Sequence, residues 1–219
     1  MHRKYEKTYR ILVPQINIIG KHFLTDEQTD ALLDGEVILC EKLDGANTAI
    51  IRTEEGFQLQ KRGGLIGEGE HPQFQFFKSW AQANYLKIMD LPVDVILYGE
   101  LCYCVHTVKY DALPDYFLAF AYLDTKTNTY MHRDTLVETC ELLGFSCVPE
   151  IARGVFKREE LFDRIPKVSN YGHNEAEGLV VWNYTKGLRG KVVREKFVKD
   201  MEEDTHWIKH QIEVNGLKK

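Results

Sequence analysis

Long apolar segments are missing from this sequence of 219 residues. Nothing in it approaches the roughly 18 consecutive apolar residues that indicate a transmembrane helix. The charged residues at the N-terminus are not followed by the apolar region of a signal peptide. We therefore expect a cytoplasmic protein that does not associate with membranes.

Paired cysteine motifs are missing as well. The chain has five cysteines but no CxxC pair, and an odd number leaves no complete disulfide framework. Reduced and mostly buried thiols are therefore expected. Cys102 and Cys104, with His106 nearby, suggest a zinc cluster, but their spacing lacks the second pair of ligands that such sites use.

An excess of positive charge is also missing, because 28 lysines and arginines face 33 aspartates and glutamates, for a formal net charge of −5. Such a chain does not coat nucleic acid through its overall charge, so any contact with nucleic acid must use a local basic patch. The hydrophobic content of 44% is that of an ordinary globular protein. We expect residues 1–219 to form a single domain.

One short stretch, Cys40-Glu41-Lys42-Leu43-Asp44-Gly45-Ala46-Asn47, lies between two apolar runs that resemble strands. A lysine beside two carboxylates, next to a glycine that lets a ligand approach the backbone, is a candidate covalent nucleophile. The same residues also fit an exposed hairpin turn, because Asp-Gly is a strong turn signal. The rest of the chain has to decide between these interpretations.

Alternating apolar residues, capping signals and turn residues predict a mixture of helices and strands. Helices are predicted from the N-cap Thr25 to Gly35, after Pro72, from the N-cap Asp134 to Gly144, over 158–165 and from about Asp204 to Ile212. Strands or extended segments are predicted over 9–14, 16–20, 37–39, 47–53, 57–62, 95–101, 116–124 and 177–182.

Two of these strands carry a glutamate to a point where it needs a partner. Glu100 lies near the end of one apolar strand, and Glu177 stands at the entrance of another. An unpaired buried carboxylate is costly, so a ligand, a metal or a cation is expected beside it. The most basic stretch, 186–197, follows, and with a period of two its Arg189 and Lys191 share one face while Arg194 lies on the other.

The stretch around Lys42 resembles the nucleotidyl-lysine motif Lys-x-Asp-Gly-x-Asn of the ATP-dependent RNA ligases. These belong to the covalent nucleotidyltransferase superfamily, together with DNA ligases and mRNA capping enzymes. Asn47 is the residue usual in the RNA-ligase branch. Further matches follow in the family's order, from about Tyr9 to Trp207: Lys61-Arg62, Tyr98-Gly99-Glu100, Phe117-x-Ala119-Phe120, Glu177-Gly178-Leu179-Val180 and Arg189-x-Lys191-x-x-Arg194.

The resemblance implies an α+β fold in which antiparallel sheets enclose a nucleotide pocket and helices lie outside, as in the ATP-grasp-like nucleotidyltransferase domain of ligases. No OB-fold is expected after it. The implied activity is ATP-dependent RNA ligation. Lys42 would first take AMP from ATP to form a lysyl-adenylate. The AMP would then pass to a 5′-phosphate end, and a 3′-hydroxyl would displace it to seal the strand.

The resemblance also implies roles for individual residues. Lys42 is the expected nucleophile, and Arg62 and Lys191 are expected to assist catalysis. A divalent cation, Mg²⁺ or Mn²⁺, is expected at Glu177, with Glu100 as a second ligand or as a partner of the ribose hydroxyls. The expected nucleotide contacts are Glu41, Asp44, Asn47, Arg62, Glu100, Phe120, Arg189, Lys191 and Arg194.

Two points stay open in the sequence. The family's closing lysine pair corresponds either to Arg189 and Lys191, which we favour, or to Arg194 and Lys196. The activity has two alternatives: a GTP-using enzyme of the capping type, and an inactive module that binds a nucleotide or an RNA end. The expected partners are ATP and RNA ends, in a nicked duplex or a broken RNA. The net acidity suggests an accessory RNA-binding partner as well.

Overall fold

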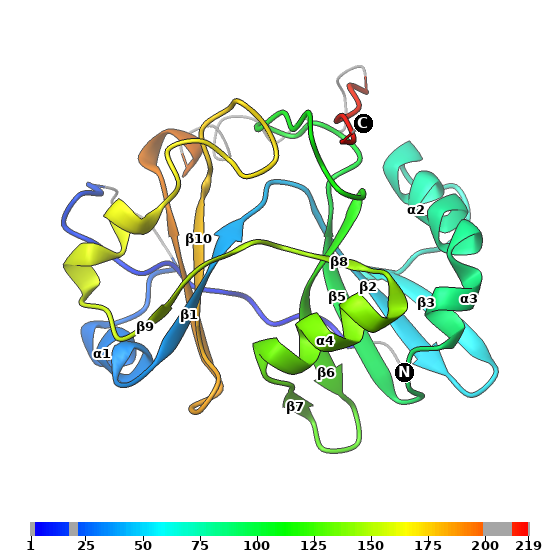
Figure 1. The fold of residues 1–219 in the computed structure, drawn as a ribbon, viewed down its shortest axis with the longest axis horizontal. Coiled ribbons are helices and arrows are strands. Elements are labelled where there is room, and N and C mark those ends of the chain that lie inside the picture. Colours follow the sequence, from blue (N-terminus) through cyan, green and yellow to red (C-terminus); the bar gives the residue numbers. More distant parts are fainter. Residues whose placement is uncertain (1–2, 18–21, 199–211, 219) are drawn as a thin grey trace.

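The computed structural model describes residues 3–17, 22–198 and 212–218. It shows two sheets side by side with helices on their outer faces (Figure 1). Most of the predicted helix from about Asp204 to Ile212 and the end of the extended segment over 16–20 lie outside the described residues.

The smaller sheet has four antiparallel strands in the order β11-β10-β1-β9. Its strands are β1 (Val37–Lys42), β9 (Glu150–Gly154), β10 (Gly178–Asn183) and β11 (Leu188–Val193). Along β1, alternate side chains face opposite sides of the sheet: Val37 and Leu39 pack outward and Ile38 and Cys40 pack towards the other sheet.

The larger sheet has the order β4-β3-β2-β5-β6-β7, and β8 pairs with β6 in the one parallel ladder found within the described ranges. Its strands are β2 (Ala46–Thr53), β3 (Gly56–Lys61), β4 (Gly64–Leu65), β5 (Val95–Leu101), β6 (Phe117–Asp124), β7 (Thr129–Tyr130) and β8 (Ser146–Cys147). The predicted mixed class with antiparallel sheets is therefore confirmed.

Helices cover the outer face of each sheet. The helical elements are α1 (Asp26–Leu33), α2 (Pro72–Ala83), α3 (Tyr85–Met89), α4 (Arg133–Leu143) and the 3₁₀ turns η1 (Arg158–Glu160) and η2 (Phe162–Arg164). Apolar residues of α2, α3 and α4 pack on the larger sheet, and Leu32 of α1 packs on the smaller one. Each sheet is thus buried on one side by helices and on the other by its neighbour.

The predicted helix boundaries hold in two places and fail in two. Thr25 caps α1 with a capping box, and Gly144 ends α4 in a left-handed conformation with φ of 73°. The cap of α4, however, is His132 rather than Asp134, because the imidazole accepts the hydrogen bond of the Asp134 N–H. The predicted helix over 158–165 is two separate 3₁₀ turns.

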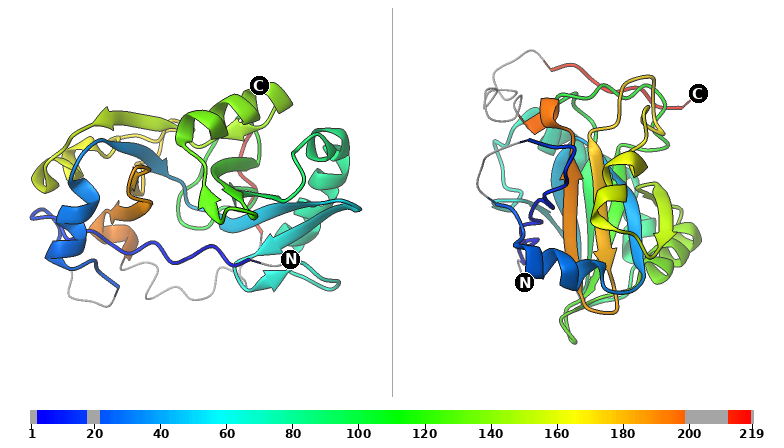
Figure 2. Two further views of the ribbon diagram at one scale, coloured as in Figure 1. Left: turned by 90° about the horizontal axis from the view of Figure 1, so that it is seen from below. Right: turned by 90° about the vertical axis from the view of Figure 1, so that its left-hand side faces the viewer.

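The N-terminal segment 3–9 crosses from one sheet to the other (Figure 2, left). At the larger sheet, the carbonyl of Arg3 accepts hydrogen bonds from Tyr98 Oη at 2.9 Å and Gln60 Nε2 at 2.8 Å. At the smaller sheet, the Lys191 N–H donates to the carbonyl of Tyr9 at 2.9 Å. The segment therefore links the two sheets, which each supply part of the region described next.

We expect Gly178→Ala to lower the free energy of unfolding by about 3 kcal/mol. A Cβ atom at this position would lie 2.1 Å from the carbonyl oxygen of Val192 on the neighbouring strand, which is main chain and cannot move aside. Equilibrium urea unfolding measures the loss. Gly67→Ala is the matched control, because a Cβ atom there meets nothing within 4 Å; equal stability of both variants would contradict the prediction.

Candidate active site

Lys42 is the last residue of β1, where the chain steps from the smaller sheet to the larger one. Because β1 and β2 belong to different sheets, the hairpin interpretation of the Asp-Gly sequence is wrong. Lys42 lies opposite Gly178 of β10, and Glu177 directly precedes that glycine. The Lys42 Nζ atom consequently reaches Glu177 Oε2 at 2.6 Å.

This ion pair is shielded from solvent, since the side chain of Lys42 is 19% exposed and that of Glu177 is 2% exposed. Burial alone would lower the pKa of the Lys42 amine, but the surrounding carboxylates of Glu177, Glu100 and Asp44 raise it above its ordinary value. Lys42 is therefore an ammonium ion here. Burial raises the pKa of Glu177, against the opposing effect of Lys42.

The second oxygen of Glu177 is available to a ligand. Glu177 Oε1 is buried and accepts no hydrogen bond from the described part of the chain. Within that same part, no group of three or more His, Cys, Asp or Glu side chains could hold a metal by itself. Mg²⁺ is commonly held by one or two carboxylates together with substrate phosphates and water, and Glu177 fits that kind of site.

A hydrogen bond between Gly45 and Glu100 links the connection between β1 and β2 to β5. The Gly45 N–H donates to Glu100 Oε1 at 3.1 Å, and Asn47 lies opposite Glu100 in the ladder of β2 and β5. A Cβ atom at position 45 would lie 2.6 Å from the Leu101 carbonyl oxygen. The close approach of β5 therefore requires a glycine here, and the approach of a ligand to this glycine stays a prediction.

Glu100 has an unusual protonation equilibrium. Burial and the nearby carboxylates of Glu177 and Asp44 raise its pKa to about 7, although Lys42 and Arg62 oppose this rise. A carboxyl group with this pKa changes its charge near neutral pH, so the charge of the site changes there too.

Asp44 is occupied by the protein itself. Its Oδ2 atom accepts hydrogen bonds from the backbone N–H groups of Thr107 at 2.6 Å and Val108 at 2.8 Å. Its own N–H donates to Tyr110 Oη at 2.7 Å. The contact of Asp44 with a nucleotide stays a prediction.

Positively charged groups approach Lys42 from three other segments. Burial, followed by the charge of Lys42, lowers the pKa of Lys191 to about 7, and Arg10 and Arg62 contribute to this shift. Arg62 is exposed and directly follows β3. Sequence reasoning predicted Lys191 and Arg62 here.

Arg10 is a member of this group that sequence reasoning missed. The N-terminal segment pairs with β11, since the Ile11 N–H donates to the Lys191 carbonyl at 2.8 Å, and this pairing places Arg10 beside Lys191. Arg10 Nε is buried and donates no hydrogen bond to any described residue. A lone arginine in an extended segment gives no sequence signal for such a place.

The structure does not bring Arg189 to Lys42. The guanidinium of Arg189 lies 4.5 to 5.1 Å from the centroids of three aromatic rings, those of Tyr5, Tyr130 and Trp182. It also pairs with Glu6 Oε2 at 3.2 Å.

Arg194 and Lys196 are held on another side of the smaller sheet. Arg194 Nε donates to the Ala176 carbonyl at 3.2 Å and pairs with Glu175 at 3.3 Å, and Lys196 also pairs with Glu175. Of the residues considered for the closing basic motif, Lys191 is therefore the one placed at Lys42. Nucleotide contacts of Arg189 and Arg194 stay predictions, and the geometry gives them no support.

Phe120 and Glu41 are the residues predicted to meet the nucleobase. Tyr98 pairs with Ala121 and Gly99 with Ala119, so a bulge leaves Phe120 outside the ladder of β5 and β6. The half-buried ring of Phe120 contacts Tyr5, with their centroids 5.1 Å apart.

Glu41 is 2% exposed, and only one of its two carboxylate oxygens accepts hydrogen bonds from the described residues. Its Oε2 atom accepts hydrogen bonds from Asn170 N at 3.1 Å and Asn170 Nδ2 at 2.7 Å. Its Oε1 atom is buried and has no hydrogen-bond donor among the described residues. Sequence reasoning missed Asn170, for which turn composition was the one available signal.

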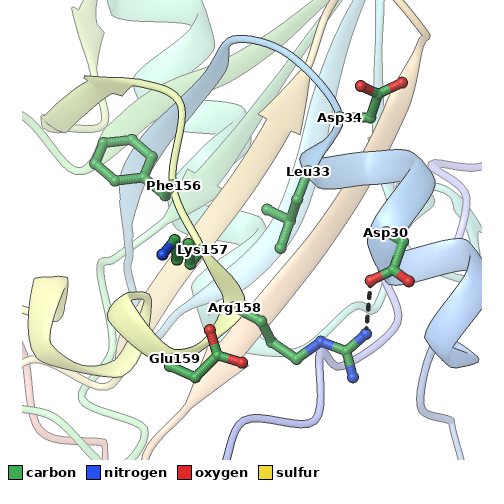
Figure 3. A pocket seen from close by; sticks show the side chains of 7 residues that line it. All are labelled: Asp30, Leu33, Asp34, Phe156, Lys157, Arg158 and Glu159. Carbon is green, nitrogen blue, oxygen red and sulfur yellow. Dashed lines mark hydrogen bonds and ion pairs between the residues drawn. The ribbon is translucent and has the colours of Figure 1, made fainter.

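A cavity of about 420 Å³ lies away from these residues, between α1 and the segment that follows β9 (Figure 3). Its lining includes Asp30 and Arg158, which form an ion pair at 3.0 Å. No residue named above for the region around Lys42 lines it. This cavity is not part of the candidate site.

The sequence model of a protein family described as RNA ligase matches residues 35–198, which include Lys42, Glu100, Glu177 and Lys191. The chain belongs to the RNA ligase family. The resemblance stated from the motifs is thereby confirmed. A search among curated proteins found no match.

Solved structures show the same fold. Naegleria gruberi RNA ligase with pyrophosphate matches with a TM-score of 0.69 and 16% identity, over 92% of this chain and 58% of that chain. A mutant of the same ligase with ATP and Mn matches with a TM-score of 0.67 and 15% identity, over 81% of this chain and 55% of that chain. The chain thus spans less than two thirds of the length of these ligases.

Glu100→Gln is expected to change how stability depends on pH. The folded-state pKa of Glu100, about 7, lies above its ordinary value of 4.5, so the folded state keeps a proton that the unfolded state releases between these values. The stabilisation due to this proton is present below about pH 4.5 and is lost as the pH rises through about 7.

The variant cannot titrate at this position. As the pH rises from 5 to 8, its free energy of unfolding minus that of the unchanged protein should therefore increase by roughly 1–3 kcal/mol. Urea unfolding at a series of pH values measures this difference. Glu54→Gln, in an exposed turn, is the control. Identical pH profiles for Glu100→Gln and the unchanged protein would refute the assignment.

Proposed function

We propose that the chain forms the adenylation domain of an ATP-dependent RNA ligase, which joins 5′-phosphate and 3′-hydroxyl RNA ends through a lysyl-AMP intermediate on Lys42. The observation that carries the proposal is the position of the Lys42 amine. It is held at 2.6 Å by the buried Glu177, beside a group of cations, in a chain of the RNA ligase family.

The first step would form a bond between Lys42 Nζ and the α-phosphorus of ATP, with loss of pyrophosphate. Lys42 must first lose a proton, because an ammonium ion is not a nucleophile. A divalent cation, Mg²⁺ or Mn²⁺, at Glu177 would neutralise phosphate charge and weaken the ion pair that keeps Lys42 protonated. Until then Glu177 orients the amine and keeps it unreactive.

The cations around Lys42 suit a polyphosphate. Transfer of a phosphoryl group depends mainly on positioning and on neutralising the charge of the phosphates. Arg10, Arg62 and Lys191 come from three different segments. Lys191 feels the charge of Lys42, and the charges of Arg10 and Arg62 act on Lys191. We assign them to the triphosphate and to the departing pyrophosphate.

The free oxygen of Glu41 favours ATP over GTP. We propose that the base enters with its C6 substituent towards Glu41 Oε1. In that orientation the 6-amino group of adenine donates a hydrogen bond to this oxygen, whereas the 6-carbonyl oxygen of guanine has no proton to donate. Phe120 is proposed to stack on the base. This arrangement supports the ATP-using ligase over the GTP-using alternative.

The RNA side of the reaction follows from the family and from charge. We propose RNA ends in a nicked duplex or a broken RNA as the substrate, and a cytoplasmic site of action. With a net charge of −5 the chain has little overall attraction for RNA, so an accessory RNA-binding partner is proposed too. None of the helices in the described part of the chain is long and apolar enough to cross a lipid bilayer.

Incubation with ATP labelled in its α-phosphate and a divalent cation should attach the label to the protein, and Lys42→Ala should abolish this labelling. Lys42 supplies the nitrogen of the proposed bond, so its loss leaves no acceptor. Denaturing gel electrophoresis with mass spectrometry of the labelled peptide measures the adduct. Lys126→Ala, which removes an exposed lysine paired with Asp94, should label normally.

Label retained by Lys42→Ala would refute the nucleophile. Binding of ATP without any adduct in the unchanged protein would favour the inactive binding module. A ligation assay across nicked duplex RNA, single-stranded RNA and RNA–DNA hybrids then identifies the substrate, and adduct formation without sealing of any of them would refute the ligase activity.

Glu41→Gln should narrow the preference for ATP over GTP by about 10-fold or more, because a glutamine amide can turn its N–H₂ group towards the guanine carbonyl. The measurement is the ratio of labelling efficiencies with the two nucleotides. Glu36→Gln, at an exposed position just before β1, is the matched control. An unchanged ratio in Glu41→Gln would exclude the proposed contact with the base.

A further inference from the structure

The segment 212–218 packs along the loop that connects β5 to β6 (Figure 1). Five backbone hydrogen bonds join them, including Val105 N to Glu213 O at 2.9 Å, Gly216 N to Tyr110 O at 2.8 Å and Leu113 N to Gly216 O at 3.0 Å. The loop, residues 102–116, has little regular secondary structure of its own. The segment 212–218 is therefore one of its main supports, together with the backbone of Tyr171.

Asn215 makes the central contacts between the two. Its side chain is buried, with 2% exposure. Asn215 Oδ1 accepts a hydrogen bond from the Tyr110 N–H at 2.7 Å, and Nδ2 donates to the carbonyls of Cys102 at 2.9 Å and Cys104 at 3.2 Å. A carboxamide is needed here, because it both accepts and donates at once.

The other side of the same loop holds Asp44. Asn215 and Gly216 hold the backbone of Tyr110 by hydrogen bonds. The Tyr110 hydroxyl accepts a hydrogen bond from the Asp44 N–H at 2.7 Å. Two further loop residues, Thr107 and Val108, donate their N–H groups to the carboxylate of Asp44. Asp44 and Asn215 are therefore both bound to this loop, and Tyr110 contacts both of them.

Asp44 lies in the short connection between β1 and β2, where residues 43–45 belong to no strand. Lys42 directly precedes this connection. Besides the Gly45 contact with Glu100 and the contact of Lys42 Nζ with the Leu43 carbonyl, the side-chain hydrogen bonds of this connection go to the loop. A shift of the loop would therefore move the end of β1 and the amine of Lys42.

We propose that Asn215 is a positioning residue for adenylation at Lys42, and that it acts through Tyr110 and Asp44. The inference rests on the proposed function, since it assumes that Lys42 is the nucleophile. Asn215 touches neither nucleotide nor Lys42. Asn215 holds the loop in place, and the loop holds Asp44, which lies two positions after Lys42.

The test measures the rate of protein labelling from ATP over a range of ATP concentrations. In Asn215→Ala the rate at saturating ATP should fall roughly 10- to 100-fold, since small displacements of reacting groups are costly. The ATP concentration for half-maximal rate should change less than about threefold, because the residues assigned to ATP lie outside the loop. Glu213→Ala, which removes an exposed pair with Lys109, is the control in the same segment and should label normally.

Tyr110→Phe examines the route of the effect. It removes the hydroxyl that meets Asp44 and leaves every contact of Asn215 in place, so it should lower the saturating rate as well. The double variant should be slower than the slower single variant by less than about threefold, because both changes break the same connection. If the two losses of rate multiply in full in the double variant, the proposal is overturned. Normal labelling by Tyr110→Phe would also overturn it, and this result can be obtained even if Asn215→Ala does not fold.

Amide hydrogen exchange adds a readout that needs no activity. In Asn215→Ala the N–H groups of Thr107 and Val108 should exchange faster, while those of β10 should keep their protection. If the unchanged protein takes no label from ATP, the proposed function fails, and exchange alone decides whether Asn215 holds Asp44. Unchanged exchange at Thr107 and Val108 would overturn this inference while leaving the proposed function intact.

Discussion

The ion pair between Lys42 and Glu177 is the interaction on which the arrangement of the site depends. Gly178 lies opposite Lys42 in the ladder of β1 and β10, which puts Glu177 beside the end of β1, and on its other side Gly178 approaches β11 so closely that no side chain fits. Removing two charges from water costs more than a pair of this kind commonly returns in stability. The pair is thus weak evidence for stabilisation of the fold, and it agrees with the role that we propose for the Lys42 amine.

The charges around this pair balance one another only in part. Carboxylates raise the pKa of Lys42, whereas burial, followed by the charges of Lys42, Arg10 and Arg62, lowers the pKa of Lys191 to about 7. A polyanion that entered this space would relieve the repulsion among these cations. The free oxygens of Glu177 and Glu41 similarly lack partners that a metal and an amino group could provide. These groups are consistent with the nucleoside triphosphate that we propose as the substrate.

The sequence predicted the parts of this site that lie next to strong local patterns. Lys42, Glu100 and Glu177 each stand at the end or entrance of an apolar strand, and alternation put Arg189 and Lys191 on one face of β11. Alternation does not say how far along the strand each residue lies from Lys42, which is why Arg189 was expected at the nucleotide and is held by aromatic rings instead. Arg10 and Asn215 gave no local signal, and Asn170 gave only that of turn composition, because their contacts join segments far apart in the chain.

The N-terminal segment gives the chain a particular order of assembly during synthesis. Residues 3–9 are synthesised before their hydrogen-bonding partners, which include Tyr98 and Lys191. Their native pairing cannot be complete until residue 191 has been added to the chain. The link between the two sheets is therefore a contact of long sequence separation, the kind that slows folding.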